Sequence, residues 1–471
     1  MFPLKQIHFV GIGGAGMSAI AWVLLKKGLS VSGSDVSRNP RSARLEKHGA
    51  KIYYGHDAEN IKHAWLVVRS SAIRDDNPEM VAAKKMGVKV LHRSEMLAKI
   101  LEEGEGVAVA GTHGKTTTTA MISLIMERAE MDPTVLIGGD LQEIGGNAKA
   151  GEGNYVVAEA DESDGSFLSY NPHYAVITNV ESDHVDHYKN KDQVFDAFRR
   201  FISQVKPKGR LILCGDDPGI RAMADVSPPC EMKLFSLTNS GADFYATDIN
   251  LLPEGSTFTV FQNGKKLGRA SLAVPGIHNI YNAMAAFSLA RVLGIGFDVM
   301  KSALESFCGT GRRFQKMGKK SGILVIDDYA HHPTEVAATL KAARPMRNER
   351  KGRIVAVFQP HRYSRTKAFA ADFAAALDNA DLAVVTDVYS AGEDEIPGVS
   401  GGLIFESMQK AGSGNAFYVP EMKNVPAKLM KIVEPGDVVF TLGAGNVWKA
   451  GERFLEKLAK KKMKTKTPDG I

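Results

Sequence analysis

Short apolar runs alternate with longer mixed segments along most of the chain. Before residue 100 these runs predict strands at Gln6–Val10, Ser30–Ser34, Lys51–Tyr54, Trp65–Val68 and Val88–Leu91. Amphipathic stretches such as Met17–Lys27 separate the strands and predict helices. Strands that alternate with helices in this way indicate a doubly wound parallel sheet, which belongs to the α/β fold class.

The pattern repeats twice more, with one change. Strands are predicted at Val107–Ala110, Tyr155–Ala158 and Tyr174–Asn179, and later at Ile323–Asp328, Arg353–Phe358 and Asp437–Thr441. Between these two groups, residues Ala242 to Val274 alternate with period two and contain the turn signal Asn263-Gly264. That stretch indicates an antiparallel patch, and a helix through Tyr281–Leu293 is predicted after it.

Two breaks in the pattern divide the chain. The acidic, glycine-bearing segment Glu102–Gly106 predicts a linker, and the chain turns again near Phe307–Phe314 before the last group of strands. We therefore predict domains at residues 1–105, 106–310 and 311–471. A length of 471 residues agrees with about three domains.

Composition excludes several classes of protein. Much of the net charge of +6 lies in Lys457–Lys464, which we interpret as a solvated helix end rather than a nucleic-acid arm. Cys214, Cys230 and Cys308 show no metal or redox spacing and predict a reducing compartment. No apolar run approaches membrane-spanning length. We predict a cytoplasmic protein that binds neither nucleic acid nor membrane.

A glycine-rich turn follows the first predicted strand. It reads Gly11-Ile12-Gly13-Gly14-Ala15-Gly16, and the second strand ends at Ser34 and Asp35. Such a turn, with an acidic residue about twenty positions later, is typical of dinucleotide binding. The turn suits any pyrophosphate and Asp35 would accept from any ribose hydroxyl, so a nucleotide-diphosphate sugar fits equally. Ser70 and Ser71 end another strand, where ligands of such sheets bind.

A second glycine turn lies after Val107–Ala110. It reads Gly111-Thr112-His113-Gly114-Lys115-Thr116-Thr117 and opens a helix. This is the layout of a phosphate-binding loop, in which backbone N–H groups converge on an anion at the positive end of a helix. Lys115 would reach the outer phosphates of ATP, and the Thr116 hydroxyl would bind Mg²⁺. A plain strand-to-helix turn with an exposed lysine is the alternative.

Candidate metal ligands end two strands of the same region. Glu159 follows Tyr155–Ala158, where a magnesium-holding carboxylate is needed beside a phosphate loop. The next acids, Asp161, Glu162 and Asp164, are interpreted as a capped helix start with solvated carboxylates. His184 follows a later strand, but Mg²⁺ prefers oxygen ligands, so chemistry alone does not assign it.

The third region carries a cationic cluster, His361-Arg362-Tyr363-Ser364-Arg365-Thr366. Arg362 and Arg365 are spaced to share one helical face, and two guanidinium groups suit a carboxylate or phosphate. A solvated basic turn is an equal alternative. Gly443 and Gly445 are interpreted as close strand–helix packing rather than another nucleotide site.

Taken together, these motifs resemble the Mur ligase family over essentially the whole chain. Further matching segments are His278-Asn279, Gly311-Arg312-Arg313-Phe314 and Asp327-Asp328-Tyr329-Ala330-His331-His332-Pro333-Thr334-Glu335. Many motifs in one order are more specific than any single motif. The resemblance implies an N-terminal Rossmann-like UDP-binding domain, a central P-loop ATPase-type domain with a mixed sheet, and a C-terminal Rossmann-like ligase domain.

The resemblance also implies residue roles. Mg²⁺ or Mn²⁺ would be held by Thr116, Glu159 and His184. In ATP, the adenine would contact Asn279, the phosphates Arg312, and the ribose Asp328. The residues around the reacting carboxylate and the incoming amino acid would be Tyr329, His331, His361, Arg362 and Arg365.

The implied reaction is ATP-dependent amide formation between L-alanine and the lactoyl carboxylate of UDP-N-acetylmuramate. It would proceed through an acyl phosphate, in a monomer or weak homodimer, with catalysis by Lys115, Glu159, His184, His331, Arg362 and Arg365. A ligase that recycles a tripeptide onto the same UDP-sugar is a close alternative. An NAD-dependent dehydrogenase would explain only the first glycine turn, and a non-catalytic nucleotide-binding regulator is a third class.

Overall fold

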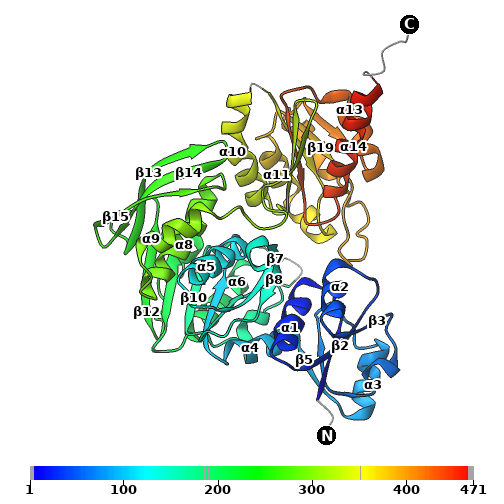
Figure 1. Cartoon of the computed structure of the whole chain (residues 1–471). Helices are drawn as coiled ribbons and strands as arrows, with labels where there is room; N and C mark the ends of the chain where they lie inside the picture. Colours follow the sequence, from blue (N-terminus) through cyan, green and yellow to red (C-terminus); the bar gives the residue numbers. More distant parts are fainter. Residues whose placement is uncertain (1–4, 184–186, 189, 351, 465–471) are drawn as a thin grey trace.

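The strands of the protein form three successive sheets. The computed structural model describes residues 5–183, 187–188, 190–350 and 352–464. Within these ranges the sheets have five, ten and six strands, and they follow one another along the chain (Figure 1). The α/β class predicted from the alternating pattern is confirmed.

The first sheet is entirely parallel, in the order β3-β2-β1-β4-β5. Its strands are β1 (Gln6–Val10), β2 (Ser30–Asp35), β3 (Lys51–Tyr54), β4 (Ala64–Arg69) and β5 (Lys89–His92). Its helices are α1 (Ala15–Lys26), α2 (Pro40–Lys47), α3 (Pro78–Met86) and α4 (Arg93–Leu101). The strand order reverses between β1 and β4, so the first glycine turn and Ser70 flank the switch point where such sheets bind ligands.

The second sheet is mixed, in the order β15-β14-β13-β12-β11-β10-β6-β9-β7-β8. Its strands are β6 (Glu105–Ala110), β7 (Thr134–Leu141), β8 (Gly146–Lys149), β9 (Tyr155–Glu159), β10 (Tyr174–Ile177), β11 (Arg210–Cys214), β12 (Glu231–Ser236), β13 (Phe244–Leu252), β14 (Gly255–Gln262) and β15 (Lys265–Leu272). Its helices are α5 (Lys115–Arg128), α6 (Lys191–Ser203), α7 (Pro218–Arg221), α8 (Ile277–Val292) and α9 (Phe297–Glu305). The antiparallel patch predicted between Ala242 and Val274 is confirmed by β13, β14 and β15.

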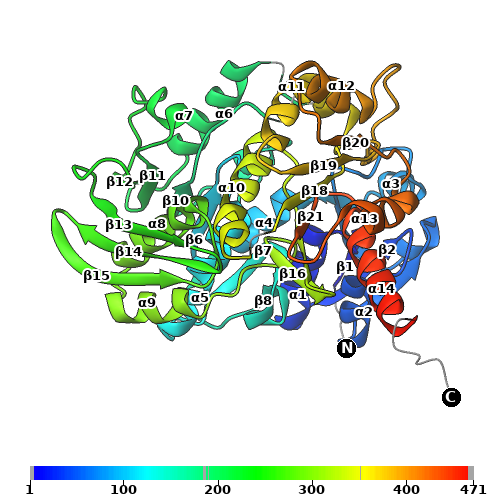
Figure 2. The same cartoon turned by 90° about the horizontal axis from the view of Figure 1, so that it is seen from above.

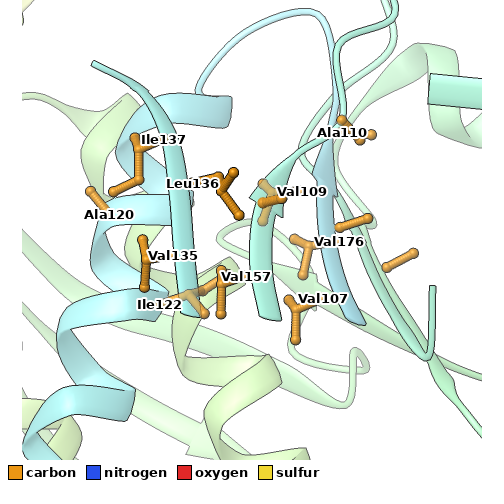
Figure 3. Packing of buried hydrophobic residues seen from close by; sticks show 14 of the residues in the cluster. Val107, Val109, Ala110, Ala120, Ile122, Val135, Leu136, Ile137, Val157 and Val176 are labelled. Atoms are coloured by element: carbon orange, nitrogen blue, oxygen red, sulfur yellow. The ribbon is translucent and has the colours of Figure 1, made fainter. Parts of the chain in front are cut away.

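The second glycine turn follows a deeply buried strand of this sheet. Strand β6 lies between β9 and β10, and Val107 and Val109 are fully buried. Figure 3 shows them beside Val157 and Val176 of the neighbouring strands, with α5 packed on β7 nearby. A strand covered on both faces reads as a continuous apolar run, which is why the sequence identified it. The loop after β6 is therefore anchored at both ends in close-packed core.

The third sheet has the order β16-β17-β21-β18-β19-β20, with only the β16–β17 pair antiparallel among the described strands. Its strands are β16 (Gln315–Lys320), β17 (Ile323–Asp328), β18 (Ile354–Phe358), β19 (Leu382–Val385), β20 (Ala416–Tyr418) and β21 (Val438–Leu442). Its helices are α10 (Pro333–Arg350), α11 (Tyr363–Leu377), α12 (Gly402–Lys410), α13 (Val425–Ile432) and α14 (Trp448–Lys464). Helix α14 confirms that the lysine-rich tail segment is helical.

Neighbouring sheets are in contact through their helices. Helix α1 of the first sheet contacts β7 and β8 of the second, and α10 of the third contacts α8 and β13. Figure 2 shows α10 beside the strands of the second sheet. In the described part of the chain, no helix combines the length and apolarity needed to cross a bilayer.

Two local predictions are wrong. The linker predicted at Glu102–Gly106 is shorter, because β6 already begins at Glu105. A Cβ at Gly106 would lie 2.8 Å from the Leu101 carbonyl oxygen, so this glycine permits close packing rather than flexibility. Arg362 precedes α11 with a positive φ of 70°, so it does not share a helical face with Arg365.

Candidate active site

The loop between β6 and α5 is a turn that requires glycine. Gly111 has φ of +128°, and a Cβ there would lie 2.1 Å from Thr178 Oγ1. Gly114 caps α5 with φ of 84°. Because both positions combine left-handed backbone with close neighbours, the loop brings its N–H groups to the start of the helix as a phosphate site needs.

Lys115 folds back over this loop. Its Nζ donates to the carbonyl oxygens of Gly111 (2.6 Å) and Thr112 (3.2 Å) and to Glu162 (3.0 Å). Burial alone would lower the pKa of Lys115, but Glu162 and then Asp161 raise it above its ordinary value. The ammonium group is therefore charged and carries its own counter-ion.

The interpretation of Glu162 as a solvated acid is wrong. Its side chain is 1% exposed and pairs with Lys115 at 2.9 Å. Asp161 and Asp164 instead pair with Arg93 of the first sheet, at 3.0 Å and 3.5 Å. The acidic segment after β9 therefore connects the lysine of the phosphate loop to the sheet that carries the first glycine turn.

Thr116 and Glu159, two of the three predicted metal ligands, lie together. Glu159 Oε1 accepts from the Gly138 N–H at 2.6 Å, and the carboxylate is hydrogen-bonded to the Thr116 side chain. Burial raises the pKa of Glu159. A hydroxyl and a carboxylate beside a phosphate loop are the oxygen donors that Mg²⁺ prefers. The third predicted ligand, His184, lies outside the described residues.

A cavity of about 320 Å³ opens beside the loop, between the second and third sheets. Its apolar walls include Phe235, Val274, Phe307 and Phe314, and its polar lining includes His113, Thr117, Asn179, His278, Asn279, Asn282, Arg313, Asp328, Thr334 and Glu335. A largely apolar cavity with a few convergent polar groups is the usual form of a nucleotide or cofactor site. Asn279 and Asp328 line it, and their assignment to adenine and ribose stays a prediction.

Asp328 is held for hydrogen bonding inside this cavity. Its carboxylate accepts from the N–H groups of Phe314 (2.7 Å) and Ala330 (2.8 Å). Burial, the largest influence, raises the pKa of Asp328 to about 6. The ionised form, present above that pH, would accept from ligand hydroxyls.

The arginine predicted to contact phosphate does not line the cavity. Arg312 donates to Asp327 at 2.8 Å and to the carbonyl oxygen of Gly443 at 2.7 Å, so it fastens the loop after β21 to the third sheet. Its neighbour Arg313 lines the cavity and lies 3.8 Å from Glu335. The sequence did not separate the two, because they are adjacent in one motif.

The residues predicted to surround the reacting carboxylate and the amino acid fall into two sets. Tyr329, His331 and His361 form a cluster of rings, whereas Arg362 and Arg365 lie apart from each other. The rings of Tyr329 and His331 lie 5.3 Å apart, and those of His331 and His361 lie 5.7 Å apart. Arg362 lies 4.0 Å from Glu393 of the same domain. Arg365 is buried and donates to Asp183 at 3.0 Å, across the two sheets.

Asp183–Arg365 is thus a buried ion pair between domains. A buried pair stabilises an arrangement only where the geometry is good, and here both Nε and Nη2 of Arg365 contact the carboxylate. It holds the third sheet over the phosphate loop.

The first glycine turn is closed by an acid. The Gly13 N–H donates to Asp35 Oδ2 at 2.8 Å, and a Cβ at Gly13 would lie 2.8 Å from that oxygen. Ser34 is fully buried and donates to Glu79, while Ser71 donates to Asp164 at 2.5 Å. Ser70 Oγ lies 3.5 Å from the position of a Cβ on Gly11. Of the four predicted side chains, Asp35 and Ser70 therefore contact the turn, while Asn39, which the sequence did not single out, donates to the Gly13 carbonyl oxygen at 3.4 Å.

The fold and site define a three-domain nucleotide-dependent ligase. Family models match in order along the chain: the Mur ligase family catalytic domain at residues 6–104, the Mur ligase middle domain at 109–290, and the Mur ligase glutamate ligase domain at 312–445. The chain belongs to the Mur ligase family.

Comparison with individual members of the family shows which enzymes the chain resembles. The chain is 46% identical to the UDP-N-acetylmuramate–L-alanine ligase of Pelotomaculum thermopropionicum, over 96% of this chain and 98% of the relative. It is 47% identical to the enzyme of the same name from Syntrophotalea carbinolica, again over 96% and 98%. The crystal structure of UDP-N-acetylmuramate-alanine ligase MurC from Thermotoga maritima aligns with a TM-score of 0.81 at 32% identity, covering 97% of this chain and 99% of that one. A murein peptide ligase from Psychrobacter arcticus aligns with a TM-score of 0.73 at 25% identity, covering 96% and 98%.

Proposed function

We propose that the chain is an ATP-dependent ligase that joins L-alanine to the lactoyl carboxylate of UDP-N-acetylmuramate, a step of peptidoglycan precursor synthesis. The observation that carries this proposal is the phosphate loop of Lys115 facing a cavity whose other wall belongs to the third sheet. Relatives of nearly full coverage that bear the alanine ligase name support the choice of substrates. We also propose domain boundaries at 105/106 and 310/311, which the three family-model ranges support.

The chemistry starts from an unreactive acid. A carboxylate does not react with an amine at neutral pH, because its leaving group would be oxide. Transfer of the γ-phosphoryl group of ATP onto one carboxylate oxygen gives an acyl phosphate and ADP. The amine of L-alanine then attacks the carbonyl carbon, the tetrahedral intermediate loses inorganic phosphate, and the ammonium proton passes to solvent.

In this proposal the chain acts by positioning and charge. Lys115 leaves Glu162 and the loop carbonyls to contact the transferred phosphoryl group, and Arg313 faces the same cavity. Asn279 binds the adenine and Asp328 the ribose hydroxyls. Thr116 and Glu159 would hold Mg²⁺, which would supply further charge neutralisation at the phosphates.

The acceptor side is proposed on the first and third domains. The turn from Gly11 to Gly16 binds the pyrophosphate of the UDP-sugar, and Asp35 binds a ribose hydroxyl. The ring cluster of Tyr329, His331 and His361 is proposed to bind the lactoyl carboxylate and L-alanine, and the contacts between its rings support treating the three residues as one group. A cytoplasmic location and the oligomeric state stay predictions.

ADP release tests the proposal. With UDP-N-acetylmuramate and ATP, we expect release only when L-alanine or a close analogue is added. Isotope-labelled oxygen in the lactoyl carboxylate should appear in the phosphate product. No transfer of label would contradict the acyl phosphate, and release driven by the tripeptide rather than alanine would favour the recycling ligase.

The dehydrogenase alternative is separated by binding alone. It requires the first glycine turn to bind NAD, whereas the present proposal requires a UDP-sugar there. Titration of the protein with each ligand decides between them, and NAD binding in preference to the UDP-sugar would contradict the assignment of the first domain.

A further inference from the structure

A second group of side chains with metal-ligating atoms lies beside the phosphate loop, apart from Thr116 and Glu159. His113, Glu181 and His332 each offer one ligand atom, and these three atoms all lie within 4.8 Å of one another. His113 belongs to the phosphate loop and Glu181 to the segment after β10, whereas His332 directly precedes α10. The group therefore bridges the second and third sheets.

His332 contributes a buried, unpaired ring nitrogen to this group. The residue is 3% exposed, and its Nε2 atom has no hydrogen-bond partner among the described residues. Its Nδ1 atom lies 3.4 Å from the Thr334 N–H, which is long for a hydrogen bond. Buried polar atoms are nearly always hydrogen-bonded, so the unpaired Nε2 of His332 is unusual. The ring of His332 lies 4.9 Å from the ring of a second histidine, His113.

The other two side chains are already oriented by outer partners. His113 Nε2 lies 2.9 Å from Glu181 Oε2, while its Nδ1 lies 3.2 Å from Glu335 Oε1. The second oxygen of Glu181 accepts from the Thr334 hydroxyl at 2.8 Å. A carboxylate on the far nitrogen of a ligating histidine is the usual outer shell of a protein metal site.

We propose that His113, Glu181 and His332 form a site for a divalent transition metal ion of the Zn²⁺ class, which fastens the phosphate loop to the start of α10. Two imidazoles and one carboxylate, with a fourth position open to solvent or ligand, suit Zn²⁺ and its congeners. The same donors suit Mg²⁺ poorly, because Mg²⁺ prefers oxygen. The site is thus distinct in chemistry from the oxygen pair Thr116 and Glu159.

Metal binding here exchanges for a proton. Burial acts to lower the pKa of His113, but its hydrogen bonds to Glu181 and Glu335 raise it to about 9. At neutral pH the ring therefore carries two protons, and the metal replaces the one on Nε2, which leaves as a solvent proton. Nδ1 keeps its proton and still donates to Glu335. The ring of His332 lies 4.9 Å from that of His113, and Arg313 lies 3.8 Å from Glu335 on the far side of the hydrogen bond.

The test uses the full chain, stripped of metal with chelator and returned to buffer containing excess Mg²⁺ but no nucleotide. Co²⁺ serves as the probe, because its visible absorption reports four-coordinate nitrogen and oxygen ligation, and Zn²⁺ serves as the competitor. We compare wild type with His332→Phe, which keeps the ring shape, and with Glu159→Gln as the matched control at the other site.

We expect one equivalent of Co²⁺ with strong four-coordinate absorption in wild type and in Glu159→Gln, displaced by Zn²⁺, and at least a tenfold loss of affinity in His332→Phe. Zn²⁺ should raise the melting temperature of wild type but not of His332→Phe. Glu181→Gln, a milder change at the exposed ligand, should show the same loss. Unchanged Co²⁺ binding in both ligand variants, or binding lost only in Glu159→Gln, would overturn the proposal. Because no substrate is present, neither outcome depends on the ligase activity.

Discussion

The two glycine turns have the same backbone layout, but the side chains that contact them have opposite charges. Each follows a buried parallel strand and opens a helix, at Gly11–Gly16 in the first sheet and at Gly111–Thr117 in the second. The first turn is closed by a carboxylate, since the Gly13 N–H donates to Asp35 at 2.8 Å. The second is closed by a cation, since Lys115 donates to the Gly111 carbonyl oxygen at 2.6 Å.

The difference shows that backbone shape alone does not define the ligand. A carboxylate at a turn selects a group that donates hydrogen bonds, such as a ribose hydroxyl, and leaves the pyrophosphate to the N–H groups. A lysine that already has a counter-ion can move to a phosphoryl group whose charge changes during reaction. The first turn is therefore suited to holding a substrate, and the second to reacting with one.

The largest expected effect is a loss of turnover when the lysine of the second turn is removed. Lys115→Ala should lower turnover by about 10³-fold or more, because a preorganised charge at the transferred phosphoryl group is lost. UDP-sugar affinity, measured by calorimetry, should stay within about twofold of wild type. Lys149→Ala, which removes a half-buried cation of the same domain paired with Glu127 and Asp132, is the control. Loss of UDP-sugar binding together with turnover would mean that the two sites are not separate.

The next largest effect is a difference in folding stability between glycine substitutions in the two turns. Gly111→Ala should lower the free energy of unfolding by about 3 kcal/mol, since it combines left-handed backbone with a clash against a hydrogen-bonded Thr178. Gly11→Ala should cost only about 1 kcal/mol, because its φ is +82° but its nearest neighbours lie at 3.5 Å. Urea unfolding of both variants tests the ranking, and an equal or reversed ranking would contradict it.

A smaller effect is expected at the acid of the first turn. Asp35→Asn should weaken UDP-sugar binding by about 10- to 100-fold, since a charged hydrogen-bond acceptor is lost, and leave ADP binding unchanged. Glu46→Gln, which removes an exposed carboxylate of the same domain, should change neither affinity. The prediction fails if ADP affinity falls as far as UDP-sugar affinity.

The smallest effect is a pH dependence confined to the second site. The pKa of Asp328 is raised to about 6 by burial, and a bound ribose favours the ionised form. ADP affinity should therefore be full above about pH 7 and fall several-fold as the pH drops to about 5. Because ADP itself titrates in this range, the measurement is the difference between wild type and Asp328→Asn. Identical profiles would mean that Asp328 does not contact the nucleotide.

The sequence predicted the strands well because they are physically distinctive. Buried parallel strands such as β6 and β18 are uninterrupted apolar runs, and period two marked the antiparallel strands. Glycine turns were found for a similar reason, since the order of strand, glycine and helix is local. The prediction of a linker through Gly106 failed because β6 begins at Glu105 and Gly106 allows close packing, which no local sequence pattern indicates.

The pairings of the site were not predictable in the same way. Glu162 meets Lys115 from 47 positions away and Asp183 meets Arg365 from 182 positions away, and a linear pattern does not state which acid meets which base. Arg312 and Arg313 are adjacent, yet Arg312 pairs with Asp327 and, of the two, Arg313 lines the cavity. Identifying the cavity residue of the two required the folded backbone.

Under the proposed function, a nucleotide bound in the cavity between the second and third sheets holds the two domains together as well as reacting. The cavity wall includes Asn279 from one domain and Asp328 from the other, so the binding site is complete only when both domains are in place. A ligand at about a hundred times its dissociation constant then adds about 2.7 kcal/mol to that attachment. When adenine nucleotides run low, the seam should open more often, and proteases should cut there first.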